Sequence, residues 1–402
     1  IVAMPAARGA ERRRAFELAA PSGLPVLTVP AASELHSGRA AIERVRDIEP
    51  EDLLGREPVQ LDEAGLSGAL SGRVVAVTGA GGSIGSELCR QVAMYGPARL
   101  VLIEQSEFAL YSIEQVLAAE FPHVPLVRLV VDVKDASALA GVFDHWRPQV
   151  VFHAAAYKHV PLMEELNAWA ALANNTMGTW CAAEAAAACG AERFVLISTD
   201  KAVNPTNVMG ATKRAAERVV SALAQRHPGT RFMAVRFGNV LGSSGSVIPK
   251  FKEQIARGGP ITVTHPDIIR YFMTIPEAAR LVLQAAAIGA TGQVLVLDMG
   301  EPVRIVDLAR DMIRLSGHTL DDIPIVYTGL RPGEKLYEEL LADSDTTLPT
   351  PIARLRLARL HHDDGAAVMQ WLHDLAAGGR LDDSRVREAL RMVVPEYRSP
   401  DR

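Results

Sequence analysis

The sequence is poor in the residues that mark several common classes of protein. It has three cysteines (Cys89, Cys181 and Cys189) in 402 residues and no C-x-x-C pair. This excludes a disulfide scaffold and a cysteine-rich zinc site, and it fits a reducing compartment. Aromatic residues make up 5% of the chain, and the formal net charge is −5. We therefore expect no base-stacking surface, no nucleic-acid partner and no metal site.

Long apolar runs are also missing. No segment reaches the roughly 18 uncharged apolar residues that a membrane helix needs, and the richest one, residues 168–189, is interrupted by Asn174, Asn175 and Glu184. No secretory signal is visible. The chain begins at Ile1 and not at methionine. We expect it to be a piece cut from a longer protein, because its first residues look like a strand that already lies inside a fold.

The pattern of apolar residues predicts an α/β protein. Residues 1–65 look like the tail of a preceding α/β domain followed by a linker, since they are too few to form a good core alone. Within residues 66–240, strand-like apolar runs alternate with helical stretches. These runs lie at residues 74–78, 100–104, 126–131, 150–153, 194–198 and 232–237. Such alternation predicts a doubly wound parallel sheet of the Rossmann type with right-handed crossovers.

After residue 240 this alternation loosens. Helices near residues 248–257 and 276–288, and short strands near 294–297 and 325–327, predict a smaller C-terminal lobe. We assign this lobe to residues 241–345 and expect it to bind the substrate. Residues 346–402 have the pattern of surface helices and are predicted to form a helical extension.

A glycine-rich turn lies between the strand at 74–78 and the helix that follows it. Gly79, Gly82 and Gly85 recur at positions i, i+3 and i+6, and Ser83 and Ile84 open the helix. Glycines here permit a tight turn and the close approach of a pyrophosphate, while the helix N-terminus offers N–H groups to the phosphates. This spacing is typical of short-chain dehydrogenase/reductase proteins. Glycines also form ordinary turns, but the strand before and the helix after them favour a dinucleotide site.

The second strand ends at Glu104. A carboxylate at this position can accept hydrogen bonds from both ribose hydroxyls of an adenosine, and it would repel a 2′-phosphate. The sequence therefore favours NAD over NADP as the cofactor. Asp132 and Val133 follow the third strand, where Asp132 is placed to reach the adenine edge. A role for Asp132 as a helix N-cap is an equal alternative.

The fourth strand is followed by Ala154, Ala155 and Ala156. Small residues there allow the chain to run close to the nicotinamide half of the cofactor. Asn175 lies inside the next predicted helix, where a polar amide needs a reason. It is expected to bridge water or backbone in the cofactor site, or else to be a buried amide with satisfied hydrogen bonds.

The fifth strand is followed by Thr199, Asp200 and Lys201. Doubly wound folds place their chemistry at the carboxyl ends of strands, although a loop ion pair with a capping threonine is the ordinary alternative. The next helix carries Met209 and Lys213 on one face. In short-chain dehydrogenases that face carries Tyr-x-x-x-Lys, with the tyrosine as catalytic base. Since a thioether cannot carry a proton, the usual base is absent from this chain.

Six segments together give a specific family resemblance. Residues 60–345 resemble the bacterial UDP-N-acetylglucosamine 4,6-dehydratases of the capsule and polysaccharide biosynthesis family. Met209 resembles the large, membrane-anchored branch, in which a cytoplasmic catalytic region follows membrane helices and a first nucleotide-fold domain. The resemblance implies a parent protein in the bacterial inner membrane and a homo-oligomer. The segments are TGAGGSIGSE, HAAAYKHVPLMEE, STDKAVNPTNVMGATKR, RFGNVLGSSGSVIPKF, MGEPVRIVDLA and RPGEKLYEEL.

The resemblance implies three chemical steps: oxidation at sugar C4, elimination of water across C5 and C6, and return of hydride to C6. It makes Asp200 the acid at C6 and Lys201 the base at C5. Thr199 would form a hydrogen bond to the C4 oxygen, and Lys213 would hold the nicotinamide ribose. Because Lys201 must be neutral to act, we expect burial or Lys213 to depress its pKa. Because Met209 replaces the tyrosine, the group that removes the proton of the C4 hydroxyl is left open. The candidates are Asp200, Thr199 through water, and a substrate-assisted route.

A second group of residues is expected to bind UDP-N-acetylglucosamine. A loop rich in glycine and serine follows the sixth strand and can wrap a diphosphate with backbone amides. The R-x-G-[DE] element of nucleotide-sugar enzymes resembles residues 331–334, with Arg331 on the diphosphate and Glu334 on the uridine ribose. Arg270 is a second phosphate candidate. Lys158 and His159 are placed to reach the sugar, and a surface position is equally open for both. The loop candidates are Asn239, Ser243, Ser244 and Val247.

Two other functions fit parts of this pattern. A nucleotide-sugar 4-epimerase would share the glycine loop, NAD and the 4-ketone, but would not need an acid and a base for elimination across C5 and C6. A non-catalytic NAD-sensing module would explain the loss of tyrosine at Met209. The retained Asp200, Lys201 and Lys213 favour an enzyme.

Overall fold

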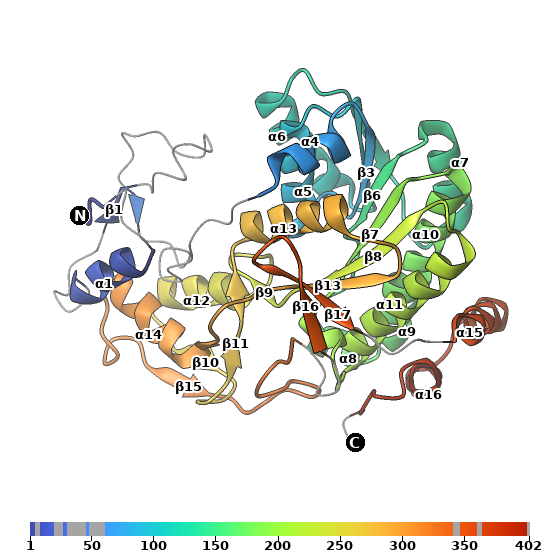
Figure 1. The fold of residues 1–402 in the computed structure, drawn as a ribbon. Coiled ribbons are helices and arrows are strands. Elements are labelled where there is room, and N and C mark those ends of the chain that lie inside the picture. The colour runs from blue at the N-terminus through green and yellow to red at the C-terminus, as the bar shows by residue number, and fades with distance from the viewer. Residues whose placement is uncertain are drawn as a thin grey trace.

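The computed structural model describes residues 1–4, 9–19, 27–29, 46–47, 61–340, 346–359 and 364–399. Within these residues a nine-stranded sheet has the order β16-β17-β13-β8-β7-β6-β3-β4-β5 (Figure 1). The strands from β13 through β5 run parallel. The six predicted strands form one unbroken part of this sheet, from β8 to the edge strand β5, and the predicted Rossmann-type fold is confirmed. They are β3 (Val74–Thr78), β4 (Arg99–Glu104), β5 (Leu126–Val130), β6 (Val150–His153), β7 (Arg193–Ile197) and β8 (Arg231–Arg236).

Helices cover both faces of this sheet, and strand β3 shows why its apolar residues are continuous. Val75 and Val77 belong to one hydrophobic core and Ala76 to the other, so neither face of the strand meets water. The first core contains α4 (Glu63–Leu70), α5 (Ser83–Met94), α6 (Glu107–Glu120) and α13 (Ile275–Ile288). The second contains α7 (Ala136–Trp146), α10 (Gly178–Cys189) and α11 (Val208–Arg226).

The order of the strands locates the crevice for a ligand. From β3 the chain continues outward through β4 and β5, and it then returns to place β6 on the other side of β3. Loops after β3 and β6 therefore leave the sheet in opposite directions, which opens a crevice at the carboxyl ends of these two strands. The glycine turn and the three alanines predicted to contact the cofactor follow these strands directly.

The smaller lobe has a core of its own. Ile248, Phe251 and Leu308 are buried there, on α12 (Val247–Ala256) and α14 (Ile305–Leu315). Short strand pairs complete it. They are β10 (Ile261–Val263) with β15 (Ile325–Tyr327), β11 (Ile269–Arg270) with β14 (Val303–Arg304), and β9 (Asn239–Val240) with β12 (Phe272–Met273).

The described part of the N-terminal region lies against this lobe (Figure 1). Phe16 of α1 (Gly9–Ala19) is buried and packs on Leu315 of α14. Strands β1 (Leu27–Thr28) and β2 (Arg46–Asp47) pair antiparallel. Within residues 1–65, predicted to be a domain tail and a linker, residues 30–45 and 48–60 lie outside the described residues.

Strand β13 (Gln293–Leu297) differs from the expectation that placed it in the smaller lobe. It pairs parallel with β8 and extends the main sheet. Val294 and Val296 point into one core, while Leu295 and Leu297 point into the other. An apolar run of this kind is buried on both faces, and only the central sheet can provide that environment.

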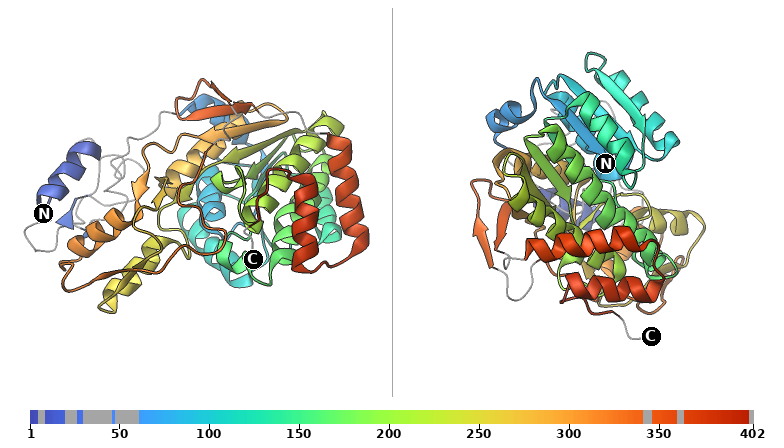
Figure 2. Two further views of the ribbon diagram at one scale, coloured as in Figure 1. Left: turned by 90° about the horizontal axis from the view of Figure 1, so that it is seen from below. Right: turned by 90° about the vertical axis from the view of Figure 1, so that its right-hand side faces the viewer.

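The C-terminal residues differ from the predicted surface helices in two ways. Strands β16 (Thr346–Pro349) and β17 (Leu355–Arg359) form an antiparallel hairpin that is added to β13 at the edge of the sheet. Helices α15 (Gly365–Gly378) and α16 (Asp383–Val393) pack over α11 as a third layer, with Leu372 and Leu390 fully buried (Figure 2). Their apolar stripe faces the protein, so helical periodicity alone did not reveal this packing.

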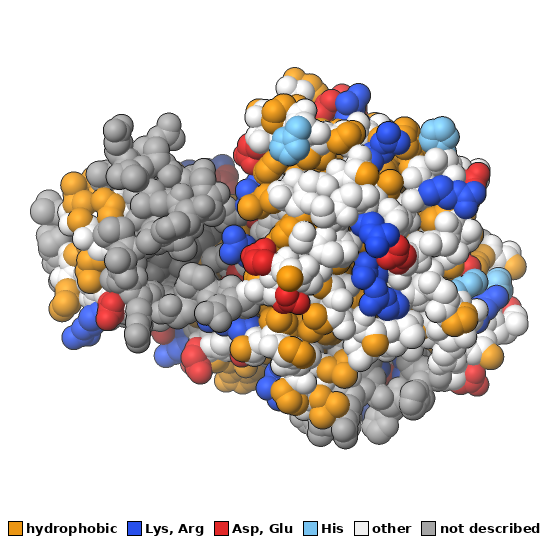
Figure 3. Space-filling model, turned by 45° about the horizontal axis from the view of Figure 1, so that its top comes forward, with side chains coloured by type: hydrophobic (Ala, Val, Ile, Leu, Met, Phe, Trp, Pro, Cys, Tyr) orange, Lys and Arg blue, Asp and Glu red, His pale blue; other side chains and the backbone are white. Residues whose placement is uncertain are grey.

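Two surface properties complete the description. Among the described residues, no helix combines the length and the apolar character that crossing a membrane requires. On the face drawn in Figure 3, Lys and Arg side chains lie among Asp, Glu and apolar side chains.

The third layer braces the helix that carries Met209 and Lys213. Glu164, at the end of α8 (Val160–Glu164), accepts a hydrogen bond of 2.8 Å from the backbone N–H of Val208 at the start of α11. Arg387 of α16 lies 3.1 Å from the other carboxylate oxygen and also donates to the Glu164 carbonyl at 2.7 Å. Both side chains are buried, at 5% and 11% exposure. The C-terminal helix therefore holds a buried charge in the core of the domain.

We expect Arg387→Ala to lower the free energy of unfolding by about 3–5 kcal/mol, because it leaves the Glu164 carboxylate buried without its cation. Urea denaturation followed by circular dichroism measures this loss. The matched control is Arg385→Ala on the same helix, whose ion pair with Asp382 is exposed, and which should cost less than about 1 kcal/mol. Equal losses in the two variants would contradict the bracing role.

Candidate active site

The glycine turn forms a cradle in which side chains have no room. Gly79 has φ +66°, and a Cβ there would lie 2.7 Å from the backbone N and Cα of Ala155. A Cβ on Gly85 would lie 1.9 Å from the carbonyl oxygen of Gly79. Gly82 precedes α5, and no side chain caps that helix. The N–H groups at Ser83 and Ile84 therefore face an open cradle that fits a pyrophosphate.

Glu104 braces this cradle from the end of β4. Its two carboxylate oxygens accept hydrogen bonds of 3.1 Å from the backbone N–H groups of Gly81 and Ser106. The residue is 9% exposed. Each oxygen keeps a further lone pair, so these bonds leave Glu104 able to accept the hydroxyls of a bound ribose.

Asp132 and Val133 lie after β5, on the same edge of the sheet. Asp132 accepts a bond of 2.9 Å from the backbone N–H of Lys134 and pairs with its ammonium at 2.7 Å. The N-cap of α7 is Asp135, so the capping role considered for Asp132 belongs to its neighbour. Val133 is buried beneath this turn.

Asn175 connects three parts of the site. Its Oδ1 accepts from the backbone N–H of Tyr157 at 2.8 Å, and its Nδ2 donates to the Tyr157 carbonyl at 3.0 Å and to the hydroxyl of Thr212 at 3.1 Å. Asn175 is fully buried in the π-helical turn η2 (Leu172–Met177). These bonds fit two of the roles expected for it, because Asn175 bridges the backbone and is also a buried amide whose hydrogen bonds are satisfied. It fixes the segment that begins with Ala154, Ala155 and Ala156 against α11.

Asp200 and Lys201 meet at the carboxyl end of β7, in the 3₁₀ turn η3 (Asp200–Ala202). Oδ1 of Asp200 accepts bonds from the Thr199 hydroxyl at 2.8 Å and from Lys201 Nζ at 3.0 Å. Asp200 is 1% exposed, yet its Oδ2 has no hydrogen-bond partner among the described residues. A Cβ on Gly238 would lie 3.1 Å from this oxygen. Because Gly238 has no side chain, space remains beside Oδ2 of Asp200, which is buried and able to accept a proton.

The electrostatics of Lys201 differ from the expectation of a neutral amine. Burial lowers the pKa of Lys201, but the carboxylates of Asp200 and Glu338 outweigh burial and leave its pKa raised above the ordinary value. The prediction of a depressed pKa was therefore wrong. It considered burial and Lys213 but could not include Glu338, whose Oε1 lies 3.6 Å from Lys201 Nζ. In this structure Lys201 is held as an ammonium.

Helix α11 brings Met209 and Lys213 to the same site. Met209 is 4% exposed and packs in the core below the crevice. Lys213 is also 4% exposed, and its ammonium has no hydrogen bond or ion pair among the described residues. Burial lowers the pKa of Lys213 to about 8. A buried amine without such a partner fits a site where a bound molecule supplies the acceptor, as predicted for the nicotinamide ribose.

Residues 241–246 lie across both predicted binding sites. The backbone N–H of Ser244 donates to the hydroxyl of Ser83 at 3.2 Å, so this loop reaches the glycine cradle. Gly245 has φ +68°, and a Cβ there would meet the ring of His159 at 2.4 Å. Ser243 is buried and Val247 opens α12. The loop expected to hold the substrate thus also contacts the first residue of α5, at the predicted cofactor site.

Two further predicted side chains lie beside this loop. Asn239 Oδ1 accepts from Lys201 Nζ at 3.4 Å, which brings the start of the lobe to the reaction centre. Lys158 and His159 are exposed on the segment that Asn175 fixes. Burial of their inner parts lowers the pKa of each side chain, and for His159 the charge of Lys158 adds to this effect.

The predicted diphosphate residues occupy different positions. Arg331 is 54% exposed, and Glu334 accepts from its backbone N–H at 3.1 Å. Arg270 is buried, and its guanidinium donates to the carbonyls of Ile269 at 2.7 Å and Lys335 at 2.9 Å. Arg331 can therefore turn toward a phosphate, whereas Arg270 clamps the segment that carries Glu334.

Glu338 was not among the residues predicted from the sequence. Its side chain is 4% exposed and lies between Lys201 and Arg270, 3.6 Å from the ammonium and 3.9 Å from the Nε of the guanidinium. The sequence shows only one acidic pair, Glu338 and Glu339, in the segment 331–340. Nothing in its spacing indicates that Glu338 reaches the carboxyl end of β7. The signal was the family segment itself.

Comparison with known proteins now adds to this geometry. Residues 75–359 match the family model described as polysaccharide biosynthesis protein. The chain belongs to the polysaccharide biosynthesis protein family. The resemblance drawn from the six segments is thereby confirmed.

Relatives of this family member come from several bacteria. The capsular polysaccharide biosynthesis protein CapD of Staphylococcus aureus is 53% identical over 79% of this chain, which spans only 53% of the length of CapD. The UDP-N-acetylglucosamine 4,6-dehydratase (inverting) of Campylobacter jejuni is 30% identical over 68% of this chain and 79% of its own. The X-ray structure of Pen from Bacillus thuringiensis is 30% identical, with a TM-score of 0.66 over 72% of this chain and 89% of Pen.

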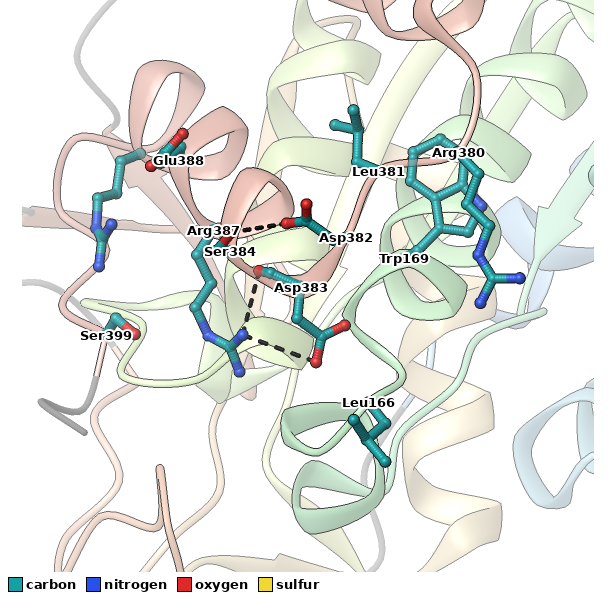
Figure 4. A pocket seen from close by; sticks show the side chains of 11 residues that line it. Leu166, Trp169, Arg380, Leu381, Asp382, Asp383, Ser384, Arg387, Glu388 and Ser399 are labelled. Carbon is teal, nitrogen blue, oxygen red and sulfur yellow. Dashed lines mark hydrogen bonds and ion pairs between the residues drawn. The ribbon is translucent and has the colours of Figure 1, made fainter.

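A separate pocket of about 950 Å³ lies away from these residues (Figure 4). It opens between Leu166 and Trp169 on one side and the start of α16 on the other. None of the residues predicted to bind cofactor or substrate lines it. Arg387 on its wall is tied to Glu164 and Asp383. We assign this pocket to the packing of the third layer.

The cradle gives a direct test with a matched control. Gly79→Ala and Gly96→Ala both place a side chain at positive φ, but only the first would meet backbone, since nothing lies within 4 Å at Gly96. We expect Gly79→Ala to weaken binding of a nicotinamide dinucleotide at least about tenfold, with Gly96→Ala unchanged. Isothermal titration calorimetry on folded protein measures both. Wild-type affinity in Gly79→Ala would show that the cradle does not hold the pyrophosphate.

Proposed function

We propose that this chain catalyses the NAD-dependent 4,6-dehydration of UDP-N-acetylglucosamine to a 4-keto-6-deoxy sugar nucleotide for bacterial surface polysaccharide. The observation that carries the proposal is the pair formed by Asp200 and Lys201. A buried carboxylate with one free oxygen lies beside an amine at the carboxyl end of β7. The family and the activity named for the Campylobacter jejuni relative support this assignment.

The chain's own residues supply the proton transfers. Oδ2 of Asp200, buried and without a partner, accepts the proton of the C4 hydroxyl, which a tyrosine would take in other short-chain dehydrogenases. NAD, held by the glycine cradle and Lys213, would supply the hydride acceptor for C4 and the hydride donor for C6. Asp200 then gives its proton to the C6 oxygen, which leaves as water, while Lys201 takes the C5 proton and later returns it to C5. Protons and electrons balance, and the net loss is one water.

The raised pKa of Lys201 fits this order of events. In the resting site the negative charge of Asp200 helps to keep Lys201 protonated. When Asp200 takes up the C4 proton, one of the two carboxylate charges beside Lys201 disappears, and the pKa of Lys201 falls. The ammonium, whose side chain is 16% exposed, can then release its proton to solvent and become the base at C5, and it takes a proton back from solvent after the C5 proton has been returned. Deprotonation of Lys201 is thus coupled to oxidation at C4.

The geometry described above supports a binding site for each of the two ligands. The glycine cradle and Lys213 would hold NAD, with Glu104 on the adenosine ribose. Arg331 would meet the diphosphate of the substrate, and the loop at 241–246 would lie between the two ligands. This part of the proposal rests on Ser244 and Ser83, whose bond of 3.2 Å joins the substrate lobe to the cradle.

Incubation with UDP-N-acetylglucosamine and NAD separates the candidate functions. A dehydratase gives a product lighter by one water in mass spectrometry. A 4-epimerase gives a product of unchanged mass and different chromatographic mobility. An NAD-sensing module binds the dinucleotide and gives no product. Either of the last two outcomes would refute the dehydratase assignment.

We expect Asp200→Asn and Lys201→Ala each to lower turnover by roughly 10²–10⁴-fold, as is usual for the loss of a group that transfers protons. Asp200→Asn keeps the shape of the side chain but removes the acceptor for the C4 proton. The matched control is Asp267→Asn, at an exposed aspartate of the smaller lobe, which should keep normal turnover. Near-normal turnover in both active-site variants would remove the pair from the mechanism.

The assignment of NAD has its own test. We expect NAD to bind at least about tenfold more tightly than NADP, because Glu104 repels a 2′-phosphate. Glu104→Gln removes the charge and should narrow this difference, whereas Glu107→Gln at the exposed start of α6 should not. Calorimetric titration of protein freed of bound nucleotide measures both affinities. A preference for NADP in the wild type would overturn the assignment.

A further inference from the structure

Glu338 is a buried carboxylate that no proton-transfer step above uses. It lies on the segment 331–340 of the smaller lobe, and its side chain is 4% exposed. Its Oε1 lies 3.6 Å from Lys201 Nζ. Removing a carboxylate from water costs free energy, and nearby cations must offset this cost. Its placement beside the amine that we assign to C5 therefore calls for a reason.

The charged groups around Lys201 come from four elements. Asp200 of η3 lies 3.0 Å from Nζ, and Asn239 of β9 offers its amide oxygen at 3.4 Å. Glu338 approaches from the lobe, and Arg270 of β11 lies behind it at 3.9 Å. Burial lowers the pKa of Lys201. The charges of Asp200 and Glu338 raise this pKa, and the charge of Arg270 lowers it. Two carboxylates and two cations thus lie together around Lys201, and Glu334 adds a third carboxylate 3.6 Å from the Arg270 guanidinium.

Arg270 fixes the position of Glu338. Its guanidinium donates to the carbonyls of Lys335 at 2.9 Å and Leu336 at 3.3 Å, which precede Glu338 in the chain. Arg270 therefore holds the segment by its backbone and faces the carboxylate of Glu338 with its Nε. This arrangement keeps Glu338 within reach of Lys201 independently of Asp200.

A second counter-charge matters because Asp200 changes its charge. Once Asp200 has taken up a proton, it can no longer pair with the ammonium, and a buried ammonium without a counter-charge would turn away or lose its place. We propose that Glu338 is a positioning residue that holds Lys201 beside Asp200 as a second counter-charge. The proposal deepens the proposed function and rests on it for the role of Lys201. It also connects the nucleotide-binding segment to the reaction centre, because Arg331 and Glu338 lie on the same stretch of chain.

The charge of Lys201 can be measured without any turnover. Competitive acetylation with acetic anhydride at a series of pH values, followed by peptide mass spectrometry, gives the fraction of Lys201 that reacts, with the exposed Lys250 as internal reference. We expect the half-maximal reactivity of Lys201 to move to lower pH by about one pH unit in Glu338→Gln, because one of its two counter-charges is lost. An unchanged midpoint in folded Glu338→Gln would overturn the proposal.

Two variants serve as controls. Glu339→Gln changes the neighbouring glutamate, which pairs with Lys335 at 2.8 Å and not with Lys201, and it should leave the midpoint of Lys201 where it is. Glu338→Asp keeps the charge on a shorter side chain and should give an intermediate midpoint. If Glu338→Gln fails to fold, the comparison of Glu338→Asp with the wild type decides, and equal midpoints there overturn the proposal.

Product formation gives an independent readout. With UDP-N-acetylglucosamine, Glu338→Gln should lower kcat with little change in KM and should move the pH profile of kcat in the same direction as the labelling midpoint. A general structural defect would change kcat without moving the profile, which would count against the proposal. If the wild type forms no product, the proposed function fails while the labelling experiment still decides whether Glu338 sets the charge of Lys201.

Discussion

Asp200 and Lys201 form a buried ion pair, and much of the surrounding structure supplies the counter-charges and hydrogen bonds that this pair needs. Charges in a protein interior need counter-charges and hydrogen bonds. Here the Thr199 hydroxyl and Lys201 share one oxygen of Asp200, and the backbone N–H of Asp200 donates to the carbonyl of Phe237 at 3.0 Å. Glu338 then brings a second carboxylate from the smaller lobe. The pair is therefore assembled from the main sheet and the lobe together.

The helix beside this pair is held by buried charges as well. Glu164 caps the start of α11 and is held by Arg387. Two turns further along, Glu217 accepts two bonds from Arg236 of β8, at 2.8 and 2.7 Å. Burial would raise the pKa of Glu217, but Arg236, Arg214 and Ser198 outweigh it and lower the pKa to about 2. A helix held in this way can present Lys213 to a bound molecule. It offsets the cost of burying an ammonium that has no hydrogen bond or ion pair among the described residues.

Much of the fold could be predicted because it depends on local patterns. The strand at 74–78 and its glycine turn follow from periodicity and from the conformations that glycine allows, and both lie where they were expected. The hairpin of β16 and β17 and the packing of α15 and α16 could not be predicted. The sequence pattern of a short edge strand is the same whether the strand meets solvent or protein, and the same holds for an amphipathic helix. The role of β13 was misassigned for the same reason, since an apolar run does not indicate which sheet receives it.

The sequence by itself determined which chemical groups are available: the glycines of the cradle, a carboxylate and an amine after β7, and a methionine where a tyrosine would act. These depend on residue type and position along the chain. Only the tertiary structure decided the charge of Lys201 and the partners of Asn175, Arg270 and Glu338. A pKa and a hydrogen bond depend on distances between residues that are far apart in the chain. Lys201 and Glu338 become neighbours only because the lobe packs against the carboxyl edge of the sheet.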